Sequence, residues 1–293
     1  MRCYLCGSDS KRVFNRVDSF GFPLIYYQCD QCGLVYQSLE ESQAADPEFY
    51  SETYRKIYQE HVEPTAKDIY VQEKRAPFLI QWIKNYLPHP PKRVLDIGAS
   101  TGILLEAFRN AFQCEVVGIE PGDAYRAYAE GKGIRMAPAL DDLIGEHPGQ
   151  FDLVSMIHVI EHLPDPVGTL KLMRENLLTS NGLILVEAPN FYAHDSYELA
   201  HLTCFTTHTL VEVLRQAGFR VQSLRRHGSP RSILLNLYVT TVAQPVDDSS
   251  LLPSIRPDRL VPQRRQVGLL YRRFVQKLFP HKAWLPLPGE KID

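Results

Sequence analysis

The sequence predicts an α/β protein with a doubly wound, mostly parallel sheet, preceded by a small N-terminal zinc ribbon. Three observations lead to this fold class. Strand patterns alternate with helix patterns between residues 91 and 245, a glycine-rich turn follows the first of these strands, and two CxxC pairs lie within residues 1–40. With 293 residues, 44% of them hydrophobic, the chain can bury a sizeable core.

The two CxxC pairs predict a structural zinc site. The expected ligands are Cys3, Cys6, Cys29 and Cys32. Four thiolates that converge from a short hairpin suit the tetrahedral geometry of zinc. Disulfides or a redox pair are the alternatives, but a redox motif needs only one CxxC. Residues 1–40 are therefore predicted to form a zinc ribbon, a module that also occurs in DNA-binding proteins.

The next segments form a helical lead-in and an alternating core. Residues 41–90 have a Tyr-rich, helical pattern that ends at the Pro-rich "LPHPPKR". In residues 91–245 the expected strands are "RVLDIGA", "EVVGIEP", "IRMAP", "FDLVSMIHV" and "LILVEAP". Two further strand patterns, "RVQSLRR" and "SILLNLYVTTVA", are joined only by "HGSPR". So short a link excludes a parallel crossover and predicts an antiparallel pair at the end of the sheet.

Residues 246–293 differ from the core because they are Pro-rich and basic. Residues 264–279 are predicted to form an amphipathic helix. Its apolar face, opposite the arginines, contains Val267, Leu270, Phe274 and Leu278. Two interpretations stay open: the helix docks on its own domain, or it contacts a membrane surface or a partner.

Charge and composition limit the partners. The formal net charge of −2 gives no general attraction to nucleic acid, and residues 1–40 contain no basic stripe. We therefore expect no nucleic-acid partner, although a zinc-ribbon nucleic-acid-binding protein remains the alternative class, and a silent scaffold a third. No signal peptide and no apolar run of membrane length is seen, so a cytoplasmic location is expected.

The run "VLDIGASTG" at residues 94–102 predicts a nucleoside site. A strand ends at Asp96, and Gly98 and Gly102 bracket a tight turn into a helix. The spacing is not GxGxxG and no Lys-Ser or Lys-Thr follows, which argues against a dinucleotide and against a P-loop. Glu120 ends the next strand, where an acid suits a ribose diol. A nucleoside without a pyrophosphate fits both facts.

The segment "HVIEH", His158 to His162, matches the HxxEH pattern of zinc peptidases. That chemistry needs one continuous helix so that both His side chains share a face. A strand pattern directly precedes the segment, and Pro164 and Pro166 directly follow it. We therefore expect no peptidase, but we expect the segment to lie at the carboxyl edge of the sheet, beside the glycine-rich turn.

Taken in order, these motifs resemble the class I S-adenosylmethionine-dependent methyltransferases related to the ubiquinone-pathway enzymes. The matching runs are "VLDIGASTG", "GIEP", "FDLVSMIHVIEHLPDP", "GLILVEAPN" and "HLTCFTTHTLVEVLRQAGF". The CxxC pairs and the Tyr-rich linker also resemble the sugar C-methyltransferases, although the third α/β domain of those enzymes is not part of this sequence. The resemblance implies a seven-stranded Rossmann-like sheet and methyl transfer to a small polar acceptor, such as a nucleotide-linked sugar, a polysaccharide or a secondary-metabolite intermediate.

The resemblance also assigns cofactor contacts. They are Asp96, Gly98, Ala99, Ser100, Gly102, Glu120, Pro121, Asp141 and His158. The first glycine-rich turn and Asp96 would hold the amino-acid part of S-adenosylmethionine, and Glu120 would hold the ribose hydroxyls. Asp141 would lie near the adenine, with Asp142 as a competitor for that role.

Methyl transfer needs alignment and a base, because the sulfonium is already activated. By resemblance to the sugar C-methyltransferases, His162 and His201 are candidate bases, and Glu161 is included as a candidate catalytic residue. A His side chain can take a proton near neutral pH. The segment Glu198 to His201 keeps that family's His, but Ala200 replaces its Glu.

Two other interpretations of this cluster stay open. His158, Glu161, His162 and His201 could bind a metal ion, as in relatives with ExxEH and a distant His, and nitrogen ligands would favour zinc, iron or nickel over magnesium. Alternatively, His158 and Glu161 only anchor the loop. The Tyr-rich segment is expected to close over the site, with Tyr50, Tyr54 and Tyr58 as candidate acceptor contacts.

Overall fold

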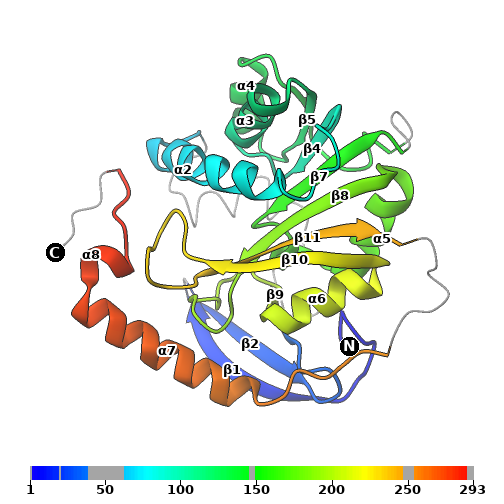
Figure 1. Ribbon diagram of the computed structural model, residues 1–293. Coiled ribbons are helices and arrows are strands. Elements are labelled where there is room, and N and C mark those ends of the chain that lie inside the picture. The colour runs from blue at the N-terminus through cyan, green and yellow to red at the C-terminus, as the bar shows by residue number, and fades with distance from the viewer. Residues whose placement is uncertain (1, 20, 39–62, 145–148, 247–253, 289–293) are drawn as a thin grey trace.

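The computed structural model describes residues 2–19, 21–38, 63–144, 149–246 and 254–288. These residues form a seven-stranded sheet with helices on both faces and a smaller four-stranded sheet that contains the N-terminal ribbon (Figure 1). A long helix near the C-terminus runs alongside the ribbon (Figure 1). The predicted fold class is confirmed.

The N-terminal ribbon is built into the rest of the protein. β1 (Lys11–Ser19) and β2 (Phe22–Cys29) form an antiparallel hairpin, and β3 (Val35–Gln37) pairs with β2. On its other side β3 pairs with β9 (Thr203–Cys204), which belongs to the core. Main-chain hydrogen bonds therefore join the ribbon to a loop that lies far away in the sequence.

The large sheet has the strand order β10-β11-β8-β7-β4-β5-β6. Its strands are β4 (Arg93–Ile97), β5 (Glu115–Ile119), β6 (Arg135–Ala137), β7 (Phe151–Ile157), β8 (Leu178–Pro189), β10 (Phe219–His227) and β11 (Tyr238–Pro245). β11 is antiparallel to both neighbours, which confirms the predicted antiparallel pair. The chain leaves β4 in one direction along the sheet and later returns to its other side. The carboxyl end of β4 is thus the switch point where such sheets bind ligands.

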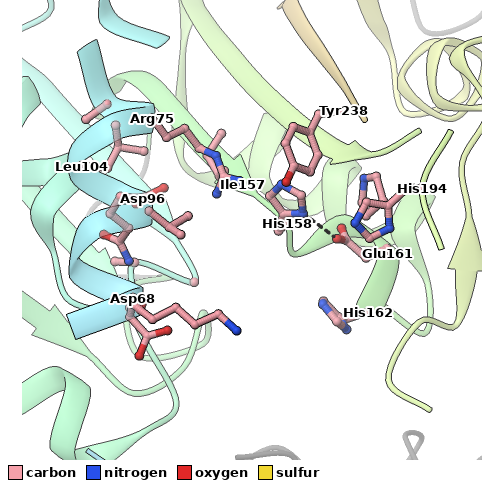
Figure 2. Close-up of a pocket in the computed structure, with 18 of the residues that line it drawn as sticks. Asp68, Arg75, Asp96, Leu104, Ile157, His158, Glu161, His162, His194 and Tyr238 are labelled. Atoms are coloured by element: carbon pink, nitrogen blue, oxygen red, sulfur yellow. Dashed lines mark ion pairs between the residues drawn. The ribbon is translucent and has the colours of Figure 1, made fainter. Parts of the chain in front are cut away.

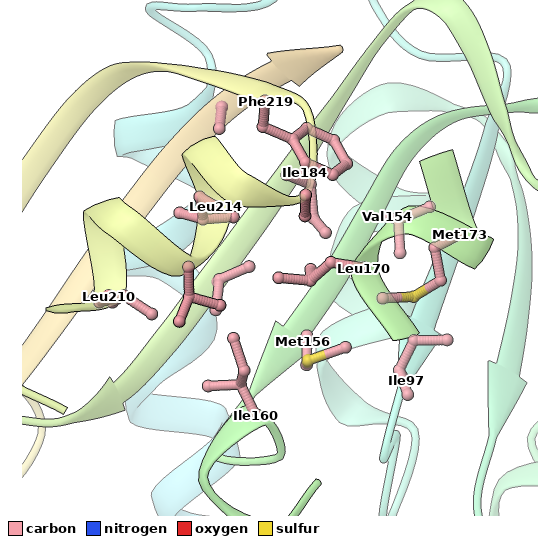
Figure 3. Packing of buried hydrophobic residues seen from close by; sticks show 14 of the residues in the cluster. Ile97, Val154, Met156, Ile160, Leu170, Met173, Ile184, Leu210, Leu214 and Phe219 are labelled. Carbon is pink, nitrogen blue, oxygen red and sulfur yellow. The ribbon is translucent and has the colours of Figure 1, made fainter. Parts of the chain in front are cut away.

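Helices cover both faces of this sheet. They are α2 (Ala66–Ile83), α3 (Ile103–Phe112), α4 (Asp123–Glu130), α5 (Pro166–Asn176) and α6 (Thr207–Gln216). Apolar residues of α2, α3 and α4 pack together against one face, while α5 and α6 pack on the other. Figure 3 shows Leu170 and Met173 of α5 and Leu210 and Leu214 of α6 over the strand residue Ile184. Their spacing of three or four residues places them on one side of each helix.

The strand expected from Ser232 begins six residues later, at Tyr238. The hydroxyl oxygen of Ser232 accepts hydrogen bonds from the main-chain N–H groups of Leu234 (3.2 Å) and Leu235 (2.9 Å), which bends the chain locally. The N–H of Ile233 donates to Lys282 O at 3.0 Å instead of joining the sheet. The hydrophobic run that begins at Ser232 therefore predicted β11 correctly, but the part of it before Tyr238 lies in a loop.

The C-terminal helix is α7 (Val261–Leu278), followed by the short α8 (Pro280–Ala283). α7 docks on the domain, one of the two interpretations that the sequence left open, and the contacts come from residues of its basic face. Arg265 is buried and donates to the carbonyls of Phe191 and His194, and Arg272 donates to Ala193 O at 3.1 Å. None of the described helices is both long enough and apolar enough to cross a membrane.

Asp258 connects the ribbon, α6 and α7, through its buried carboxylate and its main chain. Asp258 accepts hydrogen bonds from Thr206 Oγ1 at 2.6 Å and from Tyr192 OH at 3.1 Å, and it pairs with Arg264 at 3.1 Å. Its main-chain N–H donates to Cys32 O at 2.9 Å. Thr206 is the N-cap of α6, so one side chain fixes the start of that helix relative to two other parts.

We expect Asp258→Ala to lower the free energy of unfolding by about 3 kcal/mol, because the buried Thr206 hydroxyl and the half-buried Tyr192 hydroxyl lose a charged acceptor. Chemical denaturation followed by circular dichroism measures this change. The matched control is Asp195→Ala, which removes an exposed carboxylate paired with Arg272 at 2.6 Å and should change stability by less than about 1 kcal/mol. Equal losses in the two variants would contradict the role given to Asp258.

Candidate active site

A pocket of about 430 Å³ opens at the carboxyl ends of β4, β7 and β8, and α2 forms one of its walls. Its lining includes most of the predicted site residues. They are Asp96, Gly98, Ala99, Ser100, His158, Glu161, His162 and His201. Figure 2 shows Asp68 and Asp96 on one side of this pocket, facing Glu161 and His162 on the other.

The glycine-rich turn brings bare main chain to the pocket. Gly98 and Gly102 both have φ of 71°, a conformation that residues with a Cβ rarely adopt. A Cβ on Gly98 would collide with Cγ2 of Val159, and a Cβ on Gly102 would lie 2.9 Å from Cβ of Ala129. Glycine is therefore required at both positions, and the turn can stay close to the end of β7.

Asp96 is a buried acid near the end of β4, one residue before its last residue, Ile97. Its carboxylate accepts a hydrogen bond from Ser155 Oγ at 2.6 Å. Burial raises the pKa of Asp96 to about 7, although the Ser155 hydrogen bond acts in the opposite direction. A cationic group of a ligand would favour the charged form of Asp96, so this side chain suits an ammonium.

The Glu120 side chain stabilises the glycine-rich turn through a hydrogen bond to its main chain. Its carboxylate accepts hydrogen bonds from the N–H groups of Ser100 at 3.0 Å and Gly122 at 2.8 Å. Glu120, Pro121, Asp141 and Gly102 do not line this pocket. Asp141 is exposed on a turn after β6. A carboxylate oxygen can accept more than one hydrogen bond, so the ribose contact of Glu120 stays a prediction, as does the adenine contact of Asp141.

His158 directly follows β7 and lies at the edge of the pocket. Its main chain has a left-handed conformation, with φ of 58°. Only one 3₁₀ turn follows, η3 (Ile160–His162). This turn is too short to place His158 and His162 on one helical face, as the prolines predicted. His158 Nε2 lies 3.1 Å from Glu187 Oε1, and its Nδ1 lies 3.4 Å from Glu161 Oε1.

Glu187 is a buried charge that our sequence analysis missed. Its carboxylate contacts Arg75 at 3.1 Å, His227 at 3.1 Å and the Thr240 hydroxyl at 2.7 Å, in addition to His158. Burial would raise the pKa of Glu187, but the charge of Arg75 and the hydrogen bonds from the two His side chains hold it well below its ordinary value. A signal was present, because an acid interrupts the buried run "LILVEAP".

Glu161 lies deep in the pocket with its carboxylate largely unsatisfied. Its side chain is buried, and among the described residues no hydrogen bond reaches either carboxylate oxygen. The ion-pair contact with His158 is longer, at 3.4 Å. Burial would raise the pKa of Glu161, but His158 and the neighbouring His162 lower it to about 2. A charged carboxylate that lacks donors is suited to bind a cation.

His162 and His201 are brought together across the pocket, with ring centroids 5.0 Å apart. His162 Nδ1 lies 2.9 Å from Ala200 O. A carbonyl only accepts, so Nδ1 carries the proton and the lone pair of the neutral ring is on Nε2. Burial lowers the pKa of His162 to about 4, although Glu161 opposes this shift. His162 is thus a neutral imidazole at physiological pH.

His201 is held in place from the side of the ribbon. Its ring lies 3.3 Å from Ser196 O through Nδ1, and 3.6 Å from the Glu198 carboxylate through Nε2. Behind it, the buried Gln37 of β3 donates from Nε2 to the main-chain oxygens of His201 at 2.8 Å and Glu198 at 2.9 Å. Tyr26 OH donates to Glu198 O at 2.8 Å. The ribbon therefore forms the support of the loop that carries His201.

The four predicted zinc ligands meet in space. Cys3 Sγ lies 3.5 Å from Cys32 Sγ, and Cys6 Sγ lies 3.5 Å from Cys29 Sγ. All four sulfur atoms lie within 4.8 Å of one another. A tetrahedron with Zn–S bonds of ordinary length has sulfur atoms about 3.8 Å apart, so the arrangement fits a zinc ion.

Several pocket residues carried no signal in the sequence. They are Lys67, Asp68, Gln72, Arg75, His194 and Tyr238. α2 contributes the first four, and its pattern indicated a helix without indicating which end faces the site. The predicted acceptor contacts Tyr50, Tyr54 and Tyr58 lie outside the described residues.

Comparison with known proteins identifies the chain's relatives. A family model described as a methyltransferase domain matches residues 71–224, more than half of the chain. A ubiquinone biosynthesis O-methyltransferase from Pseudomonas aeruginosa is 34% identical over 102 residues, which cover 32% of this chain and 44% of the relative. The enzyme of the same name from Thiobacillus denitrificans is 31% identical over 101 residues, covering 32% and 43%. The match thus spans less than half the length of these curated relatives.

The chain is also similar to solved structures, at low sequence identity. An S-adenosylmethionine-dependent methyltransferase from Archaeoglobus fulgidus has 18% sequence identity and a TM-score of 0.49, covering 68% of this chain and 100% of that chain. One from Aquifex aeolicus has 16% identity and a TM-score of 0.48, covering 57% and 89%. The family match covers more than half of the chain, and the glycine-rich turn lies at the switch point of the sheet, so the chain belongs to the methyltransferase domain family.

Proposed function

We propose that the pocket transfers the methyl group of S-adenosylmethionine to a small polar acceptor, with His162 as the general base. One observation carries this proposal. A neutral imidazole, His162, shares a pocket with Asp96 and the glycine-rich turn, the parts that suit the cofactor. Methyl transfer needs both parts close together, because the acceptor atom must meet the methyl group in line with the bond that breaks.

The cofactor would be held by groups whose chemistry fits it. Asp96 would pair with the ammonium of its amino-acid part, and the main chain from Gly98 to Ser100, which lines the pocket, would contact it. Glu120 would accept hydrogen bonds from the ribose hydroxyls, and Asp141 would lie near the adenine. When bound, S-adenosylmethionine supplies an activated methyl group on a sulfonium, so the protein need not activate the donor.

The protein must accept the proton that the acceptor loses during methyl transfer. With the methyl group supplied by S-adenosylmethionine, the acceptor's proton would pass to Nε2 of His162. The hydrogen bond from Nδ1 to Ala200 O holds this tautomer. Glu161 favours the imidazolium that forms, and the ring of His201, with its centroid 5.0 Å away, lines the same part of the pocket.

The lining of the pocket supports a hydroxylated acceptor. Lys67, Gln72 and Glu198 contribute polar side chains around the His pair. The relatives named as O-methyltransferases support transfer to oxygen. We propose a hydroxyl on a nucleotide-linked sugar, a polysaccharide or a secondary-metabolite intermediate as the acceptor, with Tyr50, Tyr54 and Tyr58 as its contacts. The N-terminal cysteines would hold a structural zinc.

We expect His162→Ala and His201→Ala each to lower kcat at least about a hundredfold while cofactor affinity stays unchanged. Turnover assays on a panel of hydroxylated acceptors, with calorimetry of S-adenosylmethionine binding, measure both quantities. Protonation removes the lone pair of the base, so wild-type kcat should stay level through neutral pH and fall only as the pH drops toward the His162 pKa of about 4. A fall of kcat centred near pH 6.5, or full turnover by both variants, would exclude His162 as the base.

A second expectation concerns the support of His201 by the ribbon. Gln37→Leu should lower kcat about tenfold or more, because the carbonyls of Glu198 and His201 lose their donor and the His ring shifts. The matched control is Gln28→Leu, since Gln28 is equally buried on β2 but contacts Arg12. Cofactor affinity should not change in either variant. Equal kcat values for the two variants would show that Gln37 is not a positioning residue.

A specific observation favours a second candidate function, metal-dependent O-methylation. Ligand atoms of Glu161, His162 and His201 lie within 4.8 Å of one another, and no described residue donates a hydrogen bond to the Glu161 carboxylate. One carboxylate and two imidazoles match the ligands of zinc and of non-haem iron. A metal ion there would bind the acceptor hydroxyl directly and favour its deprotonated form.

Metal stoichiometry separates the two mechanisms. With the His base alone, purified protein should contain one zinc per chain, held by the ribbon. With the second candidate it should contain two, and His201→Ala should return the value to one. Plasma emission spectroscopy on the wild type, on His201→Ala and on a Cys29→Ser, Cys32→Ser variant assigns each ion to its site. One ion that His201→Ala does not affect rules out the metal mechanism.

A further inference from the structure

α7 turns an apolar face to solvent. The exposed residues are Leu260 (62%), Val267 (67%), Leu270 (63%), Tyr271 (56%), Phe274 (60%) and Leu278 (52%). Their spacing of three, four and seven residues places them along one side of the helix, the α7 stripe. Most of the large hydrophobic side chains that are exposed in the described part of the chain lie on or beside this helix. A continuous apolar stripe of this kind marks an interaction surface.

The docking of α7 explains why the stripe is not buried. The opposite side of the helix is occupied by Arg265 and Arg272, which donate to main-chain carbonyls of residues 191–194. Gly268 lies so close to Tyr192 that a Cβ there would collide with Tyr192 O. The helix therefore cannot rotate its apolar stripe toward the domain without losing these contacts.

The exposed charges at the edges of the stripe are cationic. Arg273 and Lys277 lie along one edge, and Arg264, which also pairs with the buried Asp258 at 3.1 Å, lies along the other. From Arg259 to Pro288 the sequence contains no Asp or Glu. An exposed apolar stripe with cationic edges is the arrangement by which a helix lies in the interface of an anionic membrane, with its apolar side among the acyl chains and its cations at the headgroups.

A second copy of the chain fits this surface poorly. Two α7 stripes packed together would bring Arg264, Arg273 and Lys277 of one chain beside the same residues of the other. No acidic residue of this segment is available to pair with them, so the like charges would repel. We infer that the α7 stripe binds the surface of an anionic lipid bilayer, with the helix parallel to the membrane.

A groove beside the stripe adds to the apolar surface. It has a volume of about 940 Å³ and lies between α7, α6 and β10. Val267 and Tyr271 of the stripe form part of its wall, together with Val211 and Leu224 from the domain. Arg226 and Arg264 also line it. The groove therefore extends the apolar surface of the stripe, and its lining includes these two cations and the buried carboxylate of Asp258.

Vesicle co-sedimentation of the full chain tests the inference. The wild type should bind vesicles made of phosphatidylcholine and phosphatidylglycerol in equal parts, and bind phosphatidylcholine vesicles at least about tenfold more weakly. Phe274→Ser should weaken binding to the mixed vesicles about tenfold, because one aromatic side chain no longer enters the bilayer. Arg273→Gln and Lys277→Gln should each weaken it about fivefold, and added salt should do the same.

The matched control is Val13→Ser, since Val13 is an exposed apolar side chain (45%) on β1 and is not part of the α7 stripe. Its vesicle binding should equal that of the wild type, and circular dichroism should show all variants folded. Wild-type protein that does not bind the mixed vesicles, or Phe274→Ser protein that binds them as the wild type does, overturns the inference. So does a dimer in light scattering that Phe274→Ser disrupts in the absence of lipid, because the stripe would then belong to a second copy.

Discussion

The loop of residues 190–204 needs hydrogen-bond donors for its main-chain carbonyls, and much of the structure around the pocket serves that need. After β8 the chain leaves the sheet, so most of these carbonyls have no strand beside them. Two elements supply these donors. The ribbon contributes Gln37 and Tyr26, and α7 contributes Arg265 and Arg272. A buried carbonyl without a donor is costly, so the loop depends on both neighbours.

This dependence gives the N-terminal ribbon a role in an enzyme whose chemistry lies elsewhere. The four cysteines lie on the side of the ribbon that faces the core, and Cys32 O accepts the N–H of Asp258. The same ribbon presents Gln37 to the loop that bears His201. Hydrogen bonds therefore connect the ribbon to the loop that carries His201, a candidate catalytic residue, although the two segments lie far apart in the sequence.

Much of the fold was predictable from the sequence, because each strand and helix has its own local pattern. The alternation of short apolar runs with helical periodicity predicted the sheet, and the glycines of "VLDIGASTG" predicted the turn where Gly98 and Gly102 have positive φ. The Cys pairs predicted the cluster that the structure assembles. Each of these signals lies within a few consecutive residues.

The contacts that were not predictable join parts that lie far apart in the sequence. Gln37 has no local feature that indicates donation to residues 198 and 201. The pattern of α7 indicated an apolar face but not its direction, because that depends on which carbonyls Arg265 and Arg272 meet. Glu187 could have been noticed as an acid in a buried strand, yet its partners Arg75 and His227 lie on elements whose positions the sequence did not give.

The two candidate mechanisms make opposite use of the same atoms, which makes them mutually exclusive at any one moment. A general base needs the Nε2 lone pair of His162 for the acceptor's proton, whereas a metal ion would occupy that lone pair. The role of Glu161 also differs between the two mechanisms. It stabilises the imidazolium in the first and ligates the metal ion in the second. Burial lowers the pKa of His162 to about 4, so its neutral form suits both roles. The choice between them therefore depends on whether the Glu161 carboxylate, which has no hydrogen-bond donor among the described residues, is balanced by a metal ion or by the proton that the reaction delivers to His162.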